Sequence, residues 1–184
     1  MKLIVGLGNT GEKFKNNRHS VGFVVLDKLA SKANSGQWSV SRKFHCTLST
    51  VHRTLILAKP QTMMNNSGQA VKKLVAHYKI KMPDIWVIHD DLDIKLGDYK
   101  IQKGKGPKLH NGVNSIEREL GNGNFWRVRI GIENRMPNAK WPMLNGKKIS
   151  GEQYVLQDFT KEELEILERT IDDVLPALTS GVSF

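Results

Sequence analysis

The apolar positions of the chain follow two alternating periods. Short β-branched runs and segments of period 2 predict strands, and a period near 3.6 predicts helices that bury one face. The predicted strands cover residues 3–7, 38–51, 54–58, 85–88, 99–103 and 126–132, and the predicted helices cover 21–33, a stretch after Asn66–Ser67 and about 111–120. Strands that alternate with helices are typical of α/β folds, and the hairpin at 38–58 makes the sheet mixed. We therefore expect one domain over residues 1–184, a sandwich with a central mixed β-sheet flanked by helices.

The C-terminal part contains one irregular segment and one amphipathic helix. Residues 134–151 contain proline, asparagine and lysine with little periodicity, which predicts a mobile loop. Thr160 is placed to cap the final helix. Its inward face is expected to carry Leu164, Leu167, Ile171, Val174 and Leu175.

Charge is distributed unevenly along the chain. The net charge is +10, but residues 158–184 hold seven acids against Lys161 and Arg169, so the part before residue 158 carries a formal +15. Such a body attracts polyanions, of which nucleic acid is the commonest. A solvated lysine-rich surface explains the same charge, and charge alone leaves both interpretations open.

Cysteine content and hydropathy indicate the compartment. Cys46 is the single cysteine, which excludes an internal disulfide and favours a reducing cytoplasm. The chain holds no apolar run near the roughly 20 residues that a membrane span needs, so no membrane association is expected.

The first predicted strand runs into a glycine-rich turn. Gly6 to Gly11 reads G-x-G-x-x-G, the fingerprint of dinucleotide-binding loops. That fingerprint needs a helix starting inside the loop and an acidic residue at the end of the next strand. Residues 12–18 hold one apolar residue, and Asp27 falls in the middle of a predicted helix. We reject a dinucleotide site and expect the glycines to let the chain turn tightly.

One run of acidic residues resembles a divalent-metal site. The run His89-Asp90-Asp91-Leu92-Asp93 has the carboxylates that Mg²⁺ prefers. No other acidic residue stands at a comparable strand end, and a carboxylate that orients a histidine explains the run at least as well. We expect no metal and no cofactor.

Polar residues gather where predicted strands end or predicted helices begin. Asn9, Asn65 and Asn111 each occupy such a place, Asp90 ends a strand, and His19 follows the glycine turn. Open α/β sheets collect ligand-binding residues there. A histidine that activates water, a carboxylate that orients it and amides that hold a carbonyl form a plausible hydrolytic site.

Four segments then carry a family resemblance. They are G-L-G-N at 6–9 with R-H-S-V-G at 18–22, K-P-Q-T-M-M-N-N-S-G at 59–68, H-D-D-L-D at 89–93 and H-N-G at 110–112. In this order and spacing they resemble the bacterial-type peptidyl-tRNA hydrolase family across nearly the whole chain. The resemblance implies a cytoplasmic monomer that hydrolyses the ester between a stalled peptide and the 3′-terminal ribose of tRNA, without metal or cofactor.

The resemblance also implies roles for individual residues. His19 would be the general base and Asp90 its carboxylate partner. Asn9 would sense the peptide side of the ester, and Asn65 and Asn111 would position substrate and water or stabilise the oxyanion. Three more residues would line the cleft, namely Phe14, Met63 and Met64.

Basic residues near the predicted loop 104–109 would bind the acceptor end of tRNA. They are Lys100, Lys103, Lys105, Lys108, Arg127 and Arg129. In the family a basic pair clamps the tRNA end phosphate. Arg129 matches one member, whereas Gln102 stands where a lysine or arginine is usual, and Lys103 or Lys100 is the candidate to replace it.

The sequence departs from the family pattern at several other positions. Thr10 replaces a proline, Phe14 a tyrosine, Ser20 an asparagine and Met63 a phenylalanine, and residues 106–109 are less glycine-rich than usual. All proposed catalytic residues remain, so activity is expected and its efficiency is open. The alternatives are an RNA-binding relative with weak or no catalysis, which retention of His19 and Asp90 argues against, and a nucleotide-dependent oxidoreductase, which would show cofactor absorbance.

Overall fold

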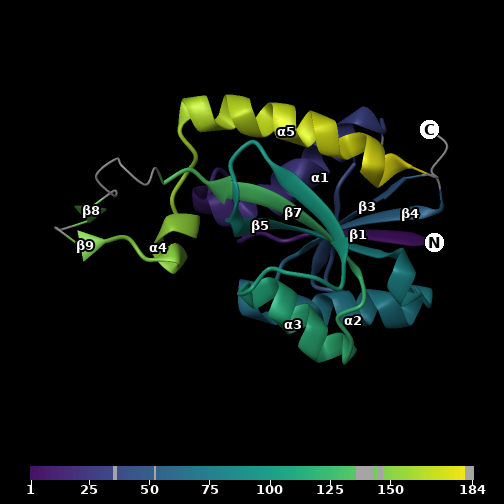
Figure 1. The fold of residues 1–184 in the computed structure, drawn as a ribbon. Helices are drawn as coiled ribbons and strands as arrows, with labels where there is room; N and C mark the ends of the chain where they lie inside the picture. Colours follow the sequence, from purple (N-terminus) through teal and green to yellow (C-terminus); the bar gives the residue numbers. More distant parts are fainter. Residues whose placement is uncertain (35–36, 52, 136–142, 145–146, 181–184) are drawn as a thin grey trace.

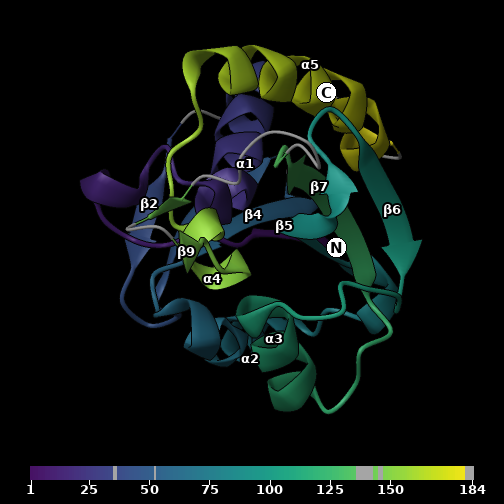
Figure 2. The same ribbon diagram turned by 60° about the vertical axis from the view of Figure 1, so that its left-hand side comes forward.

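A computed structural model describes residues 1–34, 37–51, 53–135, 143–144 and 147–180, and the apolar strand β1 (Lys2–Gly6) lies at the centre of its main sheet. The seven strands are ordered β2-β3-β4-β1-β5-β7-β6 (Figures 1 and 2). β1 runs parallel to β4 and β5, and β5 parallel to β7, whereas β2, β3 and β6 add antiparallel pairs. The mixed sheet is therefore confirmed. The other strands are β2 (Ser39–Ser41), β3 (Cys46–Val51), β4 (Leu55–Pro60), β5 (Ile85–Lys95), β6 (Tyr99–Lys103) and β7 (Trp126–Glu133).

Helices cover both faces of this sheet. α1 (Val21–Lys32) and α5 (Lys161–Thr179) pack on one face, and α2 (Ser67–Tyr78) and α3 (Asn111–Leu120) on the other (Figure 1). Each face has its own buried apolar cluster, one holding Leu26 and Ile171 and the other Leu74 and Ile116. The predicted α/β sandwich follows from strands that are apolar on both sides. None of the helices in the described ranges combines the length and apolar character needed to cross a bilayer.

The remaining elements lie beyond the end of the sheet to which β1 points. They are α4 (Gly151–Val155) and the paired two-residue strands β8 (Met143–Leu144) and β9 (Lys147–Lys148) (Figure 1). The predicted mobile loop at 134–151 includes residues 136–142 and 145–146, which lie outside the described residues.

Close packing, more than turning, explains the glycines that follow β1. A Cβ on Gly6 would lie 2.3 Å from the carbonyl oxygen of Gly22, and one on Gly22 would lie 2.4 Å from the backbone nitrogen of Leu7. α1 can approach β1 this closely only because both positions lack a side chain. Gly11, with φ of 105°, is the glycine of the fingerprint that uses a left-handed backbone. No long helix starts there, because α1 begins only at Val21.

Two strand boundaries and the burial of one residue differ from the sequence expectations. A turn at 42–45 separates β2 from β3, and β5 continues to Lys95 because it keeps pairing with β7 past an irregularity between Asp91 and Lys95. Leu164, expected to face inward, is 38% exposed. Glu163 takes the inward position instead, because it forms a buried ion pair with Arg18, and this turns Leu164 toward solvent.

The hairpin strand β3 carries the single cysteine. Cys46 is fully buried, and its thiol is free. Burial raises the pKa of the Cys46 thiol to about 12, although the nearby Lys73 acts in the opposite direction. The thiol is therefore unreactive in the folded protein.

Candidate active site

His19 lies beyond the carboxyl end of β1 and faces the buried carboxylate of Asp90. It lies in the single turn η2 (Arg18–Ser20) just before α1, and its Nδ1 is 2.8 Å from Oδ1 of Asp90 in β5. An ionised carboxylate only accepts hydrogen bonds, so Nδ1 of His19 carries the hydrogen and donates it. The Nε2 atom of His19 is left with a free lone pair, which a general base requires.

A second histidine, His110, contacts the same carboxylate oxygen, and the sequence analysis did not assign it a role. Its Nε2 lies 3.1 Å from Oδ1 of Asp90, while its Nδ1 accepts hydrogen bonds from the backbone N–H groups of Gly112 (3.1 Å) and Val113 (3.3 Å). His110 thereby caps α3. The two backbone donors require a lone pair on Nδ1, so Nε2 carries the hydrogen and donates it to Asp90. Two signals were available for His110, namely its place in the H-N-G segment at 110–112 and its position just before a predicted helix.

The pKa values of His19, His89 and Asp90 are shifted by their contacts and burial. Burial opposes the charged form of His19, but attraction to Asp90 and the hydrogen bond to it outweigh burial and raise the pKa of His19 above 6.5. Burial would raise the pKa of Asp90, yet His19 and His110 hold it far below its ordinary value. His89 is completely buried, which lowers its pKa to about 3, and its Nδ1 donates to the Asp90 carbonyl at 2.7 Å. Asp90 is therefore ionised at neutral pH and His89 is neutral.

The segments that carry the three asparagines converge beside this cluster. A Cβ on Gly112 would lie 2.6 Å from Sδ of Met64 and 2.8 Å from Cδ1 of Leu7, so the start of α3, the turn η3 (Met64–Asn66) and the end of the β1 segment touch. The amide N–H of Asn9 donates to Oγ of Ser20 at 3.1 Å.

Exposure varies among the proposed asparagines and the residues expected to line the cleft. Asn65 and Asn111 are exposed, and Asn9 is partly exposed. Phe14 is half-buried in the turn η1 (Glu12–Phe14), Met63 is 72% exposed, and Met64 is buried against Gly112. Met64 thus supports the site from beneath and offers little surface to a ligand. An open groove of about 660 Å³ also adjoins Asn9, lined by residues of α1 and the hairpin such as Phe23, Trp38 and Lys59.

The donor set argues against a metal ion among these side chains. Within the described residues, ligand atoms of His19, Asp90 and His110 lie within 4.8 Å of one another. Nε2 of His110, however, carries a hydrogen, because its Nδ1 is occupied by two backbone donors. The remaining acids of the 89–93 run do not converge on this point, because Oδ2 of Asp91 accepts from Nε of Arg129 at 2.7 Å and Asp93 is exposed.

The proposed tRNA-binding residues lie on β6, β7 and the loop between β6 and α3. Lys100, Lys105 and Lys108 are exposed, and Lys103 is half-buried. Arg129 donates from Nη1 to Oε1 of Gln102 at 2.7 Å. In the β6–β7 pairing Lys100 stands opposite Arg129 and Lys103 opposite Trp126. Opposed residues in an antiparallel pair share a face of the sheet, so Lys100, but not Lys103, lies on the face of Arg129.

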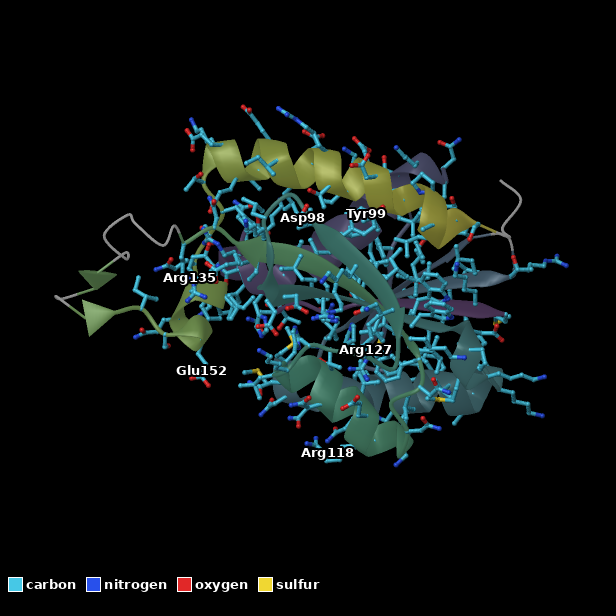
Figure 3. The ribbon with its side chains drawn as sticks, viewed as in Figure 1. Asp98, Tyr99, Arg118, Arg127, Arg135 and Glu152 are labelled. Carbon is cyan, nitrogen blue, oxygen red and sulfur yellow. The ribbon has the colours of Figure 1, made fainter. Side chains whose placement is uncertain are left out.

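Arg127 corrects one expectation from the sequence. It was expected to neutralise phosphates, but it is 4% exposed and forms an ion pair with Glu117 of α3. Its guanidinium also donates to the carbonyls of Gly106 and Gly123. Figure 3 labels Arg127 in the region between the strands of the sheet and α3. Arg127 therefore holds the 104–109 loop and α3 to the sheet, because a buried arginine needs several acceptors.

Comparison with known proteins provides independent findings. The family model described as peptidyl-tRNA hydrolase matches residues 3–183. Peptidyl-tRNA hydrolases from Geotalea daltonii and Rickettsia bellii are 40% and 38% identical, each over 95% of this chain and 86% and 89% of their own lengths. The crystal structure of peptidyl-tRNA hydrolase from Acinetobacter baumannii superposes with a TM-score of 0.80 at 30% identity, covering 97% of this chain and 87% of that one.

Proposed function

The chain belongs to the peptidyl-tRNA hydrolase family, and from this premise we propose that the cluster of His19, Asp90 and His110 is the site at which it hydrolyses peptidyl-tRNA. The observation that carries the proposal is the 2.8 Å hydrogen bond from Nδ1 of His19 to Asp90, which leaves Nε2 of His19 free for water. The buried, ionised Asp90 stabilises the imidazolium that forms when His19 takes a proton.

The reaction needs only these groups and a water molecule. Nε2 of His19 accepts a proton as the water oxygen bonds to the ester carbonyl carbon. The bond from that carbon to the ribose oxygen then breaks, and His19 returns the proton to the ribose oxygen. The products are tRNA with a free terminal hydroxyl and a peptide with a free carboxyl group. An ester is a comparatively reactive bond, so an activated water and amide donors for the oxyanion suffice.

The amides and lysines complete the proposal. Asn9 contacts the peptide side of the ester, and Asn65 and Asn111, which converge next to His110, hold the water or the oxyanion. Phe14 and Met63 provide apolar contact to the substrate. The exposed ammonium groups of Lys100 and Lys105, with Arg129 on the same face of the sheet as Lys100, bind backbone phosphates of the acceptor end, where such contacts position the substrate without reading its sequence. Lys103, on the opposite face, takes no part in this contact.

We further propose that one domain spanning residues 1–184 acts as a monomer in the cytoplasm, without metal or cofactor. Two apolar clusters on opposite faces of one sheet support a single domain. A free, buried cysteine is compatible with a reducing compartment. The hydrogen carried by Nε2 of His110 argues against a metal. Nothing observed favours the alternative of an RNA-binding relative without catalysis.

Release of N-acetyl-aminoacyl groups from tRNA tests the function, with free aminoacyl-tRNA as the substrate that should be spared. We expect His19→Ala to lower kcat by a factor of about 10² to 10⁴, the usual contribution of a general base, while affinity for a non-hydrolysable substrate analogue persists. His77→Ala, on the exposed end of α2, is the matched control. Unchanged turnover in His19→Ala would refute the base assignment, and loss of wild-type activity in chelator would refute the metal-free mechanism.

A further inference from the structure

The residue before His19 is a buried arginine whose guanidinium faces the C-terminal part of the chain. Arg18 is 4% exposed, and its Nη2 lies 2.5 Å from Oε2 of Glu163, which is 6% exposed. Its Nη1 donates to the carbonyl of Asp158 at 2.7 Å. Both partners of this ion pair are thus shielded from water, and the cost of desolvating them offsets much of their attraction, so the pair is weak evidence for stability.

Aromatic rings enclose the guanidinium. The guanidinium carbon of Arg18 lies 4.3 Å from the ring centre of Tyr154 and 5.2 Å from that of Phe159. Tyr154 is itself fixed, because its hydroxyl donates to the carbonyl of Ile132 at 3.1 Å. Arg18 therefore has almost no freedom to move relative to β7, α4 and the start of α5.

Glu163 is held as firmly as Arg18. Its Oε2 also accepts from the backbone N–H of Thr160 at 2.9 Å, and its Oε1 accepts from Nδ2 of Asn134 at 3.1 Å. These bonds keep the pKa of Glu163 below its ordinary value despite the opposing effect of burial. The carboxylate is thus ionised at neutral pH, and a single side chain joins the end of β7, the cap of α5 and the turn that contains His19.

Backbone contacts reinforce the same junction. The N–H of Arg18 donates to the carbonyl of Gln157 at 3.1 Å, and the N–H of Phe159 donates to the carbonyl of Asn16 at 3.0 Å. Nδ2 of Asn17 donates to the side chain of Asp158 at 2.6 Å. On the other side of His19, Oγ of Ser20 accepts a hydrogen bond from the backbone N–H of Asn9. His19 therefore lies between two anchored neighbours, and within the described part of the chain its own side chain makes one hydrogen bond, to Asp90.

We propose that Arg18 and Glu163 are positioning residues for the hydrolysis, forming a buried clamp that fixes the backbone of His19 so that its Nδ1 reaches Asp90. The inference rests on the proposed role of His19 as the base. Catalytic geometry tolerates errors of only about 0.5 Å, and such accuracy comes from the residues that support the reacting group. A clamp built from α4 and α5 makes the C-terminal part of the chain a component of the active site although it supplies no reacting atom.

Glu163→Gln tests the clamp, because it keeps the shape of the side chain and an acceptor for the helix cap while it removes the charge. We expect kcat to fall at least about tenfold, as a displacement well under 1 Å would produce, with KM changed less than about twofold. The acidic limb of the pH profile of kcat/KM should also move to lower pH, because a displaced His19 is less stabilised in its charged form by Asp90.

Two variants of α5 serve as controls. Glu168→Gln removes an exposed ion pair with Lys28 that joins α5 to α1. Asp172→Asn removes the ion pairs with Lys28 and Lys32, which also join α5 to α1. Both should keep kcat within about twofold of wild type and leave the acidic limb in place, because neither touches the supports of His19.

Arg18→Lys provides a second variant should Glu163→Gln fail to fold, since it keeps the charge and loses the planar fork. It should fold and show an intermediate loss of kcat. Normal kcat and an unmoved limb in both variants, with His19→Ala inactive, would overturn the clamp and leave the proposed function intact. A loss of kcat with an unmoved limb would likewise overturn positioning through Asp90. An active His19→Ala would instead overturn the proposed function.

Discussion

At the scale of single residues, the three histidines around Asp90 differ in which ring nitrogen carries the hydrogen, and this difference cannot be read from the sequence. Nε2 of His89 has a free lone pair, but its complete burial and a pKa of about 3 make it a poor base. His110 has its hydrogen fixed on Nε2 by the start of α3. His19 combines a free Nε2 and partial exposure with a raised pKa.

The raised pKa of His19 predicts the pH dependence of activity. His19 must be neutral to accept a proton, so kcat/KM should fall as pH is lowered through a value above the 6.5 of an ordinary histidine. Asp90→Asn removes the attraction that raises this pKa, so the limb should move to lower pH while kcat falls at least about tenfold. Initial rates between pH 5 and 9 measure both effects. A limb that stays in place in Asp90→Asn would contradict the assignment.

Sequence reasoning reached His19 and Asp90 through the family resemblance but missed His110. The reason is physical, since its role depends on two backbone N–H groups of α3 and on a carboxylate 20 residues earlier, and neither spacing nor periodicity encodes such contacts. Arg18 and Glu163 were missed for the same reason, because a buried ion pair between residues 145 positions apart looks like two ordinary surface charges in the sequence.

At the scale of elements, periodicity predicted the strands and helices, but it did not predict which elements pack against each of their faces. Arg127 was expected to bind phosphates, yet it is buried, because α3 and the 104–109 loop cover that part of β7. Leu164 shows the converse, an apolar position displaced from the interior by Glu163. The register of the β6–β7 pair adds information, because it places Lys100 on the same face of the sheet as Arg129 and Lys103 on the opposite face.

That register predicts unequal effects of two lysines on tRNA binding. Lys100→Ala should raise KM severalfold and reduce the slope of log KM against log salt by about 0.7 to 0.9, the loss of one phosphate contact. Lys103→Ala, on the other face of the same strand, is the matched control and should change both quantities much less. Steady-state rates at several salt concentrations measure the slopes. A larger effect in Lys103→Ala would move the phosphate site to the opposite face.

At the scale of the whole molecule, the acidic C-terminal part of the chain and the proposed phosphate-binding lysines lie on different elements of the fold. The acids of the C-terminal part lie mainly on α5, where Glu168 and Asp172 pair with Lys28 and Lys32 of α1. The proposed lysines lie on β6 and on the loop that leads to α3, and the start of β6 meets α5, where the hydroxyl of Tyr99 donates to the carbonyl of Asp173 at 3.4 Å. These pairs neutralise part of the acidic charge of α5, whereas Lys100 and Lys105 are exposed on β6 and the following loop.

Salt should therefore act on binding and not on chemistry. KM for N-acetyl-aminoacyl-tRNA should rise steeply with salt, because binding releases counterions from the tRNA, while kcat stays nearly constant. A substrate carrying the same ester on a short oligonucleotide should lose most of this dependence, because it presents few phosphates. Equal salt dependence for both substrates would place the phosphate contacts at the ester itself, and a fall in kcat with salt would implicate the chemical step.

The buried thiol of Cys46 on β3 can be used to measure local opening of the hairpin. Only a thiolate reacts with disulfide reagents, so at mildly alkaline pH Cys46 is silent while the hairpin is closed and reacts once it opens. The rate of labelling under native conditions then counts opening events without any introduced dye or mutation. Comparing that rate with global unfolding in urea would tell whether β2, β3 and β4 detach on their own or only when the entire sheet comes apart.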